Sequence, residues 1–377
     1  MNIDIIGAGI GGLTAAIALE QKGIRTRIFE QAERIKPVGA GIILANNAMQ
    51  VYEKLGLRKT IEENGNVISS MNITQPDLNP LSKIDLTYFE QKHRTKNIAI
   101  HRGALQQLLL DRLKSTEINL HHALTSVVEN SNGYSLMFAN GKQVQSSVIL
   151  GADGLNSVVR QHMFPNNSLR NAHQVCWRGI TEYTLPNQFK HELNEAWGKS
   201  ERFGFVPIAE NTVYWYAVKS FRKSKHELSV DDLPHYFSDY DPVIQDLISS
   251  TKKERVNTAE ISDLKPTHTW FRDTLCLIGD SAHATTPNIG QGACQAIEDA
   301  FVLAECLGKY EVGQAFSEYQ RLRLPKAHRV VKTSWLVGKV AHLNNPLLRS
   351  VRNQLLRLTP ASVNRKQNAQ LFQLAEV

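Results

Sequence analysis

The chain has 377 residues, of which 42% are hydrophobic and 21% charged, and its formal net charge is +7 at pH 7. This length exceeds one ordinary hydrophobic core and the composition excludes a disordered chain, so two domains are expected. The positive balance suits anionic ligands or acidic surfaces. Basic runs interleaved with aromatic residues, which indicate nucleic-acid binding, are absent, so no nucleic-acid partner is expected.

The cysteines and the N-terminus exclude further classes of protein. Four cysteines form no CxxC pair and no zinc spacing, which argues against a disulfide scaffold and against a metal site. The N-terminus lacks the basic region and cleavage site of a secretory signal, and no apolar run has the length of a transmembrane helix. We therefore expect a cytoplasmic protein with reduced cysteines.

The first predicted unit, within residues 2–30, is a strand, a glycine-rich turn, a helix and a second strand. Its turn carries the spacing GxGxxG on Gly7, Gly9 and Gly12, and Glu30 follows eighteen residues after the last glycine. The first glycine permits the tight turn, the second lets the backbone approach a pyrophosphate, and the third lets helix and strand pack closely. The acid accepts hydrogen bonds from ribose hydroxyls, so the unit predicts a dinucleotide site.

Further elements are predicted from there to residue 150. They are a helix over 46–55, irregular to β-like chain over 67–100, a helix opening at His101-Arg102, and strands over 119–124, 125–130, 134–139 and 144–150. Arg102, at the start of its helix, is either a partner for a phosphate or flavin edge or a solvated charge.

A second glycine turn, Gly151-Ala152-Asp153-Gly154, ends the strand over 144–150 and precedes a predicted helix start. Residues 175–218 alternate in polarity and are rich in aromatic residues, which predicts an antiparallel sheet with one face turned inward. A charged stretch over 230–250 is predicted to be helical.

A third turn follows the apolar strand over 275–278. Gly279-Asp280 breaks the strand, a loop holding His283 and Pro287 follows, and a helix begins at Ala293 after Gly290-Gln291-Gly292. A helix that begins after glycines presents free N–H groups and the positive end of its dipole to an anionic or electron-rich group. From residue 312 the chain is helical and basic, with Pro325, Pro346 and Pro360 as predicted helix breakers.

Three motifs stand together: GxGxxG with Glu30, GADGxxSxxR at 151–160, and GDSAHxxxPxxGQG at 279–292. Their combination resembles the single-component FAD-dependent aromatic hydroxylases, the p-hydroxybenzoate hydroxylase-like family, and among them the urate- and salicylate-type hydroxylases. The resemblance implies an α/β fold, with a Rossmann-like FAD-binding domain, a discontinuous antiparallel β-sheet substrate domain and C-terminal helices. The implied bounds are 1–70, 98–170 and 270–325 for the FAD-binding domain, 71–97 and 171–269 for the substrate domain, and 326–377 for the helical segment.

The resemblance implies one FAD held along its length, with NAD(P)H as a transient cosubstrate that has no dinucleotide domain of its own. The implied FAD contacts are Gly7, Gly9, Gly12, Glu30, Arg34, Arg102, Leu124, Asp153, Asp280, Pro287, Gly290, Gln291, Gly292, Ala293 and Cys294. Asp153 is associated in this family with NAD(P)H as well, and Cys294 stands where many relatives have Asn.

The implied reaction is hydroxylation of a small aromatic or heteroaromatic substrate by O2, through a flavin C4a-hydroperoxide and without a metal. In the sheet over 175–218, Arg202 is the candidate to hold a substrate anion and Tyr214 the candidate hydrogen-bond or acid–base partner. Arg178 is a second anion candidate. Each of these three residues could instead only pack on the sheet or be a solvated charge, with no role in binding the substrate. His283 is expected to orient backbone rather than to catalyse.

Two other functions stay open. One is a membrane-associated epoxidase or quinone-pathway hydroxylase of a lipid-like substrate, with the leucine-rich, basic segment 347–358 on a membrane surface. Alternatively, these helices pack on the FAD-binding domain or on another subunit, with their arginines outside. The protein is expected to be a monomer or a homodimer. The other function is a flavin-binding sensor without turnover. A flavin-dependent halogenase is excluded because its Trp-x-Trp-x-Ile-Pro stretch is absent.

Overall fold

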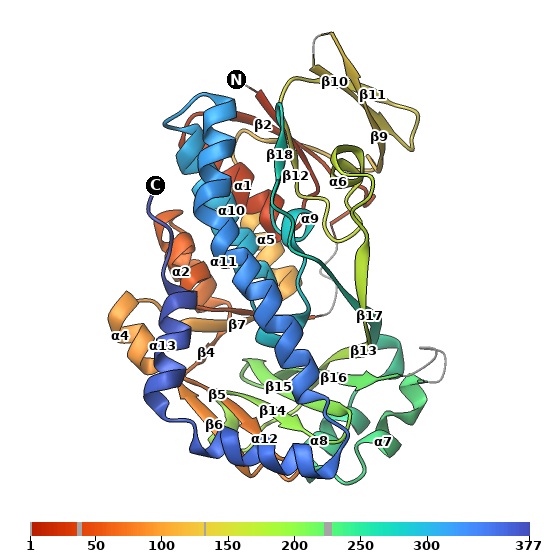
Figure 1. Ribbon diagram of the computed structural model, residues 1–377, viewed down its shortest axis with the longest axis vertical. Helices are drawn as coiled ribbons and strands as arrows, with labels where there is room; N and C mark the ends of the chain where they lie inside the picture. The colour runs from red at the N-terminus through yellow and green to blue at the C-terminus, as the bar shows by residue number, and fades with distance from the viewer. Residues whose placement is uncertain (1, 36–39, 132, 222–227) are drawn as a thin grey trace.

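The computed structural model describes residues 2–35, 40–131, 133–221 and 228–377, and two large sheets organise it (Figure 1). The first is six-stranded, in the order β18-β19-β12-β1-β2-β8. Its strands are β1 (Asn2–Ile6), β2 (Arg25–Phe29), β8 (Glu117–Asn119), β12 (Ile149–Gly151), β18 (Phe271–Arg272) and β19 (Leu275–Leu277). All neighbours pair in parallel except β18 and β19, so β1, β12 and β19 end at the same edge.

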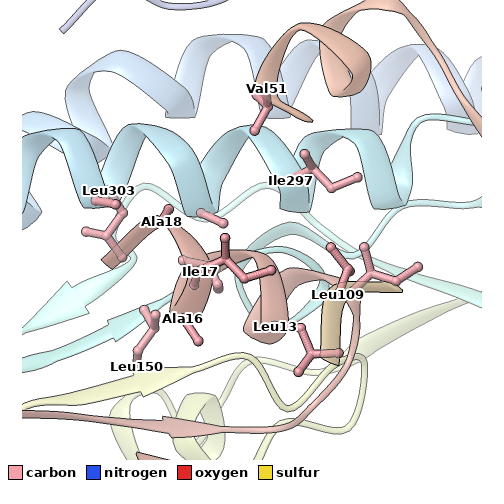
Figure 2. Close-up of a cluster of buried hydrophobic side chains, with 14 of the residues drawn as sticks. Leu13, Ala16, Ile17, Ala18, Val51, Leu109, Leu150, Ile297 and Leu303 are labelled. Atoms are coloured by element: carbon pink, nitrogen blue, oxygen red, sulfur yellow. The ribbon is translucent and has the colours of Figure 1, made fainter. Parts of the chain in front are cut away.

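Helices cover this sheet. They are α1 (Ile10–Gln21), α2 (Asn46–Lys54), α3 (Arg58–Glu63), α5 (Arg102–Arg112), α6 (Val158–Met163), α9 (Asp280–His283), α10 (Gly292–Leu307) and the long α11 (Val312–Ala341). Figure 2 shows the apolar contact between them, where Leu13 and Ile17 of α1 lie near Ile297 and Leu303 of α10 and Leu109 of α5. The helix predicted within residues 2–30 and the one predicted over 46–55 are confirmed.

The second large sheet has seven strands, in the order β17-β13-β16-β15-β14-β5-β6. They are β5 (Ser70–Thr74), β6 (Pro80–Asp85), β13 (Leu169–Glu182), β14 (Glu192–Trp197), β15 (Glu201–Ala209), β16 (Thr212–Ser220) and β17 (Asn257–Leu264). One face buries Trp177, Phe203 and Trp215 in the cluster that includes α7 (Leu233–Tyr236) and α8 (Pro242–Ser249). The other face is turned toward the first sheet. The predicted antiparallel sheet over 175–218 is therefore confirmed.

Two three-stranded sheets complete the described strands. The first consists of β3 (Gly41–Leu44), β4 (Asn66–Ile68) and β7 (Asn97–His101), and the second of β9 (Leu124–Asn130), β10 (Gly133–Phe138) and β11 (Gln143–Ser146). Val206 and Tyr214 of the seven-stranded sheet share a buried cluster with Ile98 and Ile100 of β7. The sheet of β3, β4 and β7 therefore joins the two large sheets.

Three predictions of local structure are wrong. The strand over 119–124 is interrupted after Asn119, because His121 has a positive φ of 57° and the amides of His121 and His122 donate to the carbonyls of Ala32 and Glu30. The strand over 144–150 is divided between β11 and β12. Pro325 does not break a helix but lies inside α11, where packing against α10 outweighs the lost hydrogen bond. The implied boundary between the FAD-binding domain and the C-terminal helical segment, at 325, therefore falls within one helix.

The C-terminal helices are α12 (Pro346–Leu358) and α13 (Ala361–Phe372), and α4 (Thr87–His93) lies beside α13 in Figure 1. The expectation that the arginines of these helices lie outside is wrong for Arg352 of α12, whereas Arg357 of the same helix is exposed. Arg352 is only 5% exposed and donates to the carbonyls of Val340 and Ala341, which the end of α11 leaves without helical partners. None of the helices in the described ranges combines the length and the hydropathy needed to cross a membrane.

The contact of α1 with α10 gives a test of the core. Ile297→Ala removes a fully buried side chain between these helices, so we expect a loss of about 2–5 kcal/mol in the free energy of unfolding. Urea titration followed by circular dichroism measures it. Val128→Ala, at an exposed position of β9, is the control and should change stability by less than about 0.5 kcal/mol. Equal effects of the two substitutions would contradict this packing.

Candidate FAD and substrate site

The three glycine turns meet at the shared edge of the six-stranded sheet. A β-carbon added at Gly7, whose φ is +106°, would lie 2.5 Å from the carbonyl oxygen of Ala152, and one added at Gly12 would lie 2.1 Å from that of Gly7. A β-carbon at Gly279 would lie 2.7 Å from that of Ala296 in α10. Only glycine permits these approaches, so the motif spacings are a direct consequence of how closely the backbone packs here.

Hydrogen bonds fasten the second turn to the third. The hydroxyl of Ser281 lies 2.5 Å from the carbonyl oxygen of Gly151, and Arg160 donates to the carbonyl of Ser281 at 3.1 Å. Asp153 accepts from the amides of Val158 and Val159 and so caps α6. The Asp and Arg of the GADGxxSxxR motif and the Ser of GDSAH therefore hold these turns in shape.

The carboxylate of Glu30 lies at the first turn. One oxygen accepts from the amide of Ala8 at 2.8 Å and the other from the amide of Ala32 at 2.9 Å. A carboxylate has about four lone-pair positions, so these bonds fix its orientation and leave acceptor capacity for ribose hydroxyls.

Asp280 and Asp153 have the environment expected at the wall of a ligand cleft. The side chain of Asp280 is exposed, yet surrounding protein desolvates it and raises the pKa of its carboxyl. It lies 3.8 Å from where a β-carbon of Gly292 would stand, at the first residue of α10. Burial also raises the pKa of Asp153, whose Oδ1 is buried without a partner in the described chain. Polar acceptors beside a helix N-terminus fit the hydroxyls and pyrophosphate of FAD.

The other residues implied to contact FAD divide into two groups. Arg34, Arg102, Pro287 and Gly290 are exposed, and Leu124, Gly292 and Ala293 are half-buried. Gln291 and Cys294 are buried instead: Gln291 accepts from Asn47 at 3.0 Å, and the thiol of Cys294 lies 3.6 Å from the carbonyl oxygen of Ile43. Burial raises the pKa of Cys294 to about 12. These two side chains are therefore engaged by protein, and their contact with FAD stays a prediction.

The side chain of His283 is buried against a carboxylate of α10, and its expected role in orienting backbone stays a prediction. Its Nε2 lies 2.5 Å from Asp299 of α10, and the same carboxylate accepts from the amide of Gly279 and from Arg323 of α11. Burial alone would raise the pKa of Asp299, but His283 and Arg323 outweigh it and hold the pKa well below the usual range. Asp299 therefore ties the third turn, α9 and α11 together.

The candidate substrate residues share one face of the seven-stranded sheet. Arg178 pairs with Tyr216 across β13 and β16, and Tyr214 is two residues along, so their side chains leave the sheet on the same side. Burial raises the pKa of the Tyr214 phenol, Cys176 raises it further, and Arg178 and Arg102 partly offset the rise. The phenol is thus neutral at neutral pH and lies near two cations.

Arg202 has a different environment. Its guanidinium is 1% exposed, donates to Glu195 at 3.0 Å, and also donates to Asn288. Glu195 additionally accepts from Trp197 at 2.6 Å and from the Tyr216 hydroxyl. Asn288 lies in the short 3₁₀ helix η5 (Pro287–Ile289) of the third motif. Arg202 thus bridges the seven-stranded sheet, which we expect to hold the substrate and call the substrate sheet, to the loop predicted to face the flavin ring.

The sequence analysis missed Glu195, Asn288, Asp299 and Arg323. Asn288 lies inside a recognised motif, which is the one signal that pointed to it. The others are charged residues on ordinary strands and helices, where the default expectation is exposure. Their roles depend on pairing across the fold, such as that of Arg323 with Glu298 and Asp299.

Comparison with known proteins agrees with this geometry. Residues 1–334 match the family described as an FAD binding domain. The chain is 33% identical to aurachin C monooxygenase/isomerase of Stigmatella aurantiaca over 95% of this chain and 94% of that one. It is 30% identical to 2-heptyl-3-hydroxy-4(1H)-quinolone synthase of Pseudomonas aeruginosa, covering 99% and 98%. The structure of Klebsiella pneumoniae HpxO with FAD and uric acid superposes with a TM-score of 0.89 at 25% identity, covering 99% and 96%.

The chain therefore belongs to the FAD-binding family of single-component aromatic hydroxylases, and it is an FAD-dependent monooxygenase. The fold class and the FAD cofactor predicted from the sequence are confirmed. The individual contact residues and the domain bounds stay predictions.

The position of Asp280 gives a test of the cofactor site. Asp280→Ala should purify folded but with FAD affinity lowered about 10- to 100-fold, because a carboxylate acceptor for the cofactor is removed from an exposed position. The measurement is the ratio of flavin absorbance to protein after gel filtration. Asp239→Ala, at an exposed carboxylate of the substrate domain, is the matched control. Unchanged flavin content in Asp280→Ala would contradict the assignment.

The pKa of Asp299 gives a second test. Because the folded pKa is depressed, its stabilising contribution is present above the usual value of 3.8 and is lost as the pH falls through the folded pKa. We expect Asp299→Asn to lower the free energy of unfolding by about 3–5 kcal/mol at pH 7, because Arg323 loses a buried partner. The gap between wild type and variant should hold down to about pH 4 and narrow below it. A gap that closes between pH 8 and 6 would contradict this account.

Proposed function

We propose that the protein hydroxylates a small electron-rich aromatic or heteroaromatic ring that carries an acidic N–H or O–H group. In the overall reaction, substrate, O2, NAD(P)H and a proton give hydroxylated product, NAD(P)⁺ and water. When bound, FAD supplies the electron transfer and the activation of O2, and the chain supplies position and charge.

One observation supports this proposal most strongly. Arg102 offsets the pKa rise of both Asp280 and Tyr214, so it lies within electrostatic range of both carboxyl and phenol. The ring of Tyr214 also packs on Gly41, where an added β-carbon would lie 2.3 Å from it. Asp280 belongs to the cofactor turn and Tyr214 to the substrate sheet. The two halves of the predicted site are therefore adjacent.

Arg178 is the residue we propose to hold the deprotonated substrate. It is half-buried on the same sheet face as Tyr214, and its electrostatic neighbours are Cys176 and Tyr214 rather than an acid. An incompletely neutralised guanidinium in a desolvated position favours an anion, and the neutral phenol of Tyr214 donates a hydrogen bond to it. An anionic ring is more electron-rich and accepts an oxygen atom more readily.

Arg202 is proposed as a positioning residue. The substrate-anion role expected for it stays a prediction, but its guanidinium is already engaged by Glu195 and Asn288. Through Asn288, which also donates to the carbonyl of Ser334 at 2.8 Å, Arg202 holds the η5 loop against α11.

A lipid-like substrate is the second candidate. The names of two relatives describe a monooxygenase of aurachin C and a synthase of a heptyl-substituted quinolone, a heteroaromatic ring with a hydrocarbon tail. The observation that favours this candidate is the apolar outer face of α12, on which Leu347, Leu355 and Leu358 are exposed. Under this proposal the ring chemistry is unchanged, and the tail requires an apolar channel.

Oxygen labelling tests the proposal. Purified protein with NADPH or NADH is screened with aromatic acids, purines and alkyl-substituted quinolones under ¹⁸O2. We expect one class to accelerate NAD(P)H oxidation and to yield product with one ¹⁸O atom. Bound substrates that leave NAD(P)H consumption unchanged, or consumption that yields only hydrogen peroxide, would favour the sensor alternative.

Substitution at Arg178 tests the proposed anion site. Arg178→Ala should keep FAD and lower kcat/KM about 10- to 100-fold, because a charge-assisted hydrogen bond to the substrate is lost. Arg178→Lys should recover part of that loss. Arg255→Ala, an exposed arginine of the same domain, is the control. An equal loss with substrate analogues that have no acidic proton would show that Arg178 acts on the fold instead.

A further inference from the structure

Helix α12 turns an apolar face to solvent. Leu348, Val351, Leu355 and Leu358 recur every three to four residues and Leu347 lies next to Leu348, so the five form one stripe along the helix. Leu347 is 77% exposed, Leu355 62% and Leu358 76%. A surface helix of a globular protein normally buries such a stripe, so this exposed face indicates a binding surface.

The opposite side of α12 is polar and faces the protein. Arg352 donates to the end of α11 and stacks on Trp197 of β14, with 5.3 Å from the guanidinium carbon to the ring centroid. Asn345 caps the helix by accepting from the amides of Leu347 and Leu348. These contacts hold α12 in this orientation, so the outward apolar face is built into the fold.

The segment that carries this face has charges of one sign, and the nearby Asp85 of β6 lies within electrostatic range of Arg365. The chain has no Asp or Glu between residues 319 and 375, whereas Lys and Arg recur throughout that stretch. Arg357 of α12 and Arg365 and Lys366 of α13 are exposed. An apolar helical stripe flanked by cations complements an anionic lipid surface, where hydrocarbon takes the leucines and headgroups take the arginines.

We propose that α12 docks the protein on anionic lipid membranes by lying in the interface plane with its leucine stripe inward. A second copy of the chain fits less well, because a two-fold contact between these faces would bring the cations of this segment together, and the segment itself carries no acid to offset them. The docking is independent of which ring is hydroxylated. Since Trp197 pairs with Arg202 across β14 and β15, docking places the substrate sheet directly behind the membrane contact.

Vesicle flotation with the FAD-loaded protein tests this proposal. We expect binding to vesicles of phosphatidylcholine mixed with phosphatidylglycerol, weaker binding to phosphatidylcholine alone, and weakening by salt. The double variant Val351→Gln/Leu355→Gln should bind at least about tenfold more weakly. Arg357→Gln should weaken binding to the mixed vesicles about fivefold and should leave binding to phosphatidylcholine alone unchanged.

The control is Val128→Gln/Leu169→Gln, which removes exposed apolar side chains from strands β9 and β13 and should bind like the wild type. Flavin content and melting temperature of each variant show that it is folded. Absence of wild-type binding to the mixed vesicles, or unchanged binding of the α12 double variant, would overturn the proposal. So would a dimer in solution that the α12 double variant dissociates, because the face would then join two copies.

Discussion

The close approach of three backbone turns at one sheet edge is the constraint on which this structure depends. Gly7 lies against Ala152, and Gly279 lies against Ala296, at separations that leave no room for a side chain. This packing aligns the start of α1, the cap of α6 and the start of α10 around one space. Ser281, Arg160 and Asp299 then fix the turns to each other and to α11. A dinucleotide cofactor needs such a rigid frame, because its phosphates and ring are held largely by backbone groups.

Electrostatic interactions of two arginines connect this frame to the seven-stranded sheet. Arg102 lies in electrostatic range of both Asp280 and Tyr214, and Arg202 reaches from Glu195 to Asn288 in the loop of the third motif. In the first connection, the neutral phenol of Tyr214 lies beside half-buried Arg178, and this environment suits an anionic ring. In the second connection Arg202 is buried and bonded to Glu195 and Asn288, which suits support of a loop. We therefore propose different roles for Arg178 and Arg202, which look alike in the sequence but have different partners.

The sequence revealed those features that follow from local geometry. Gly7, Gly12 and Gly279 were recognisable because a close backbone approach requires glycine itself, and the order of the motifs indicated the fold. Pairing across the fold was not recognisable: Glu195 with Arg202, and Asp299 with Arg323, each come together only after folding. Pro325 misled because helix packing outweighed its local preference. The orientation of α12 was also missed, since its stripe of leucines predicts burial and Arg352 predicts exposure.

The most direct measurement is a crystal structure of the purified protein with FAD. The account predicts one extended FAD per chain, with its ribose at Glu30, its central part beside Asp280 and the start of α10, and its ring between the 287–293 loop and Tyr214. Clear density for FAD elsewhere, or a protein that stays colourless with excess FAD while its three turns are formed, would contradict the account.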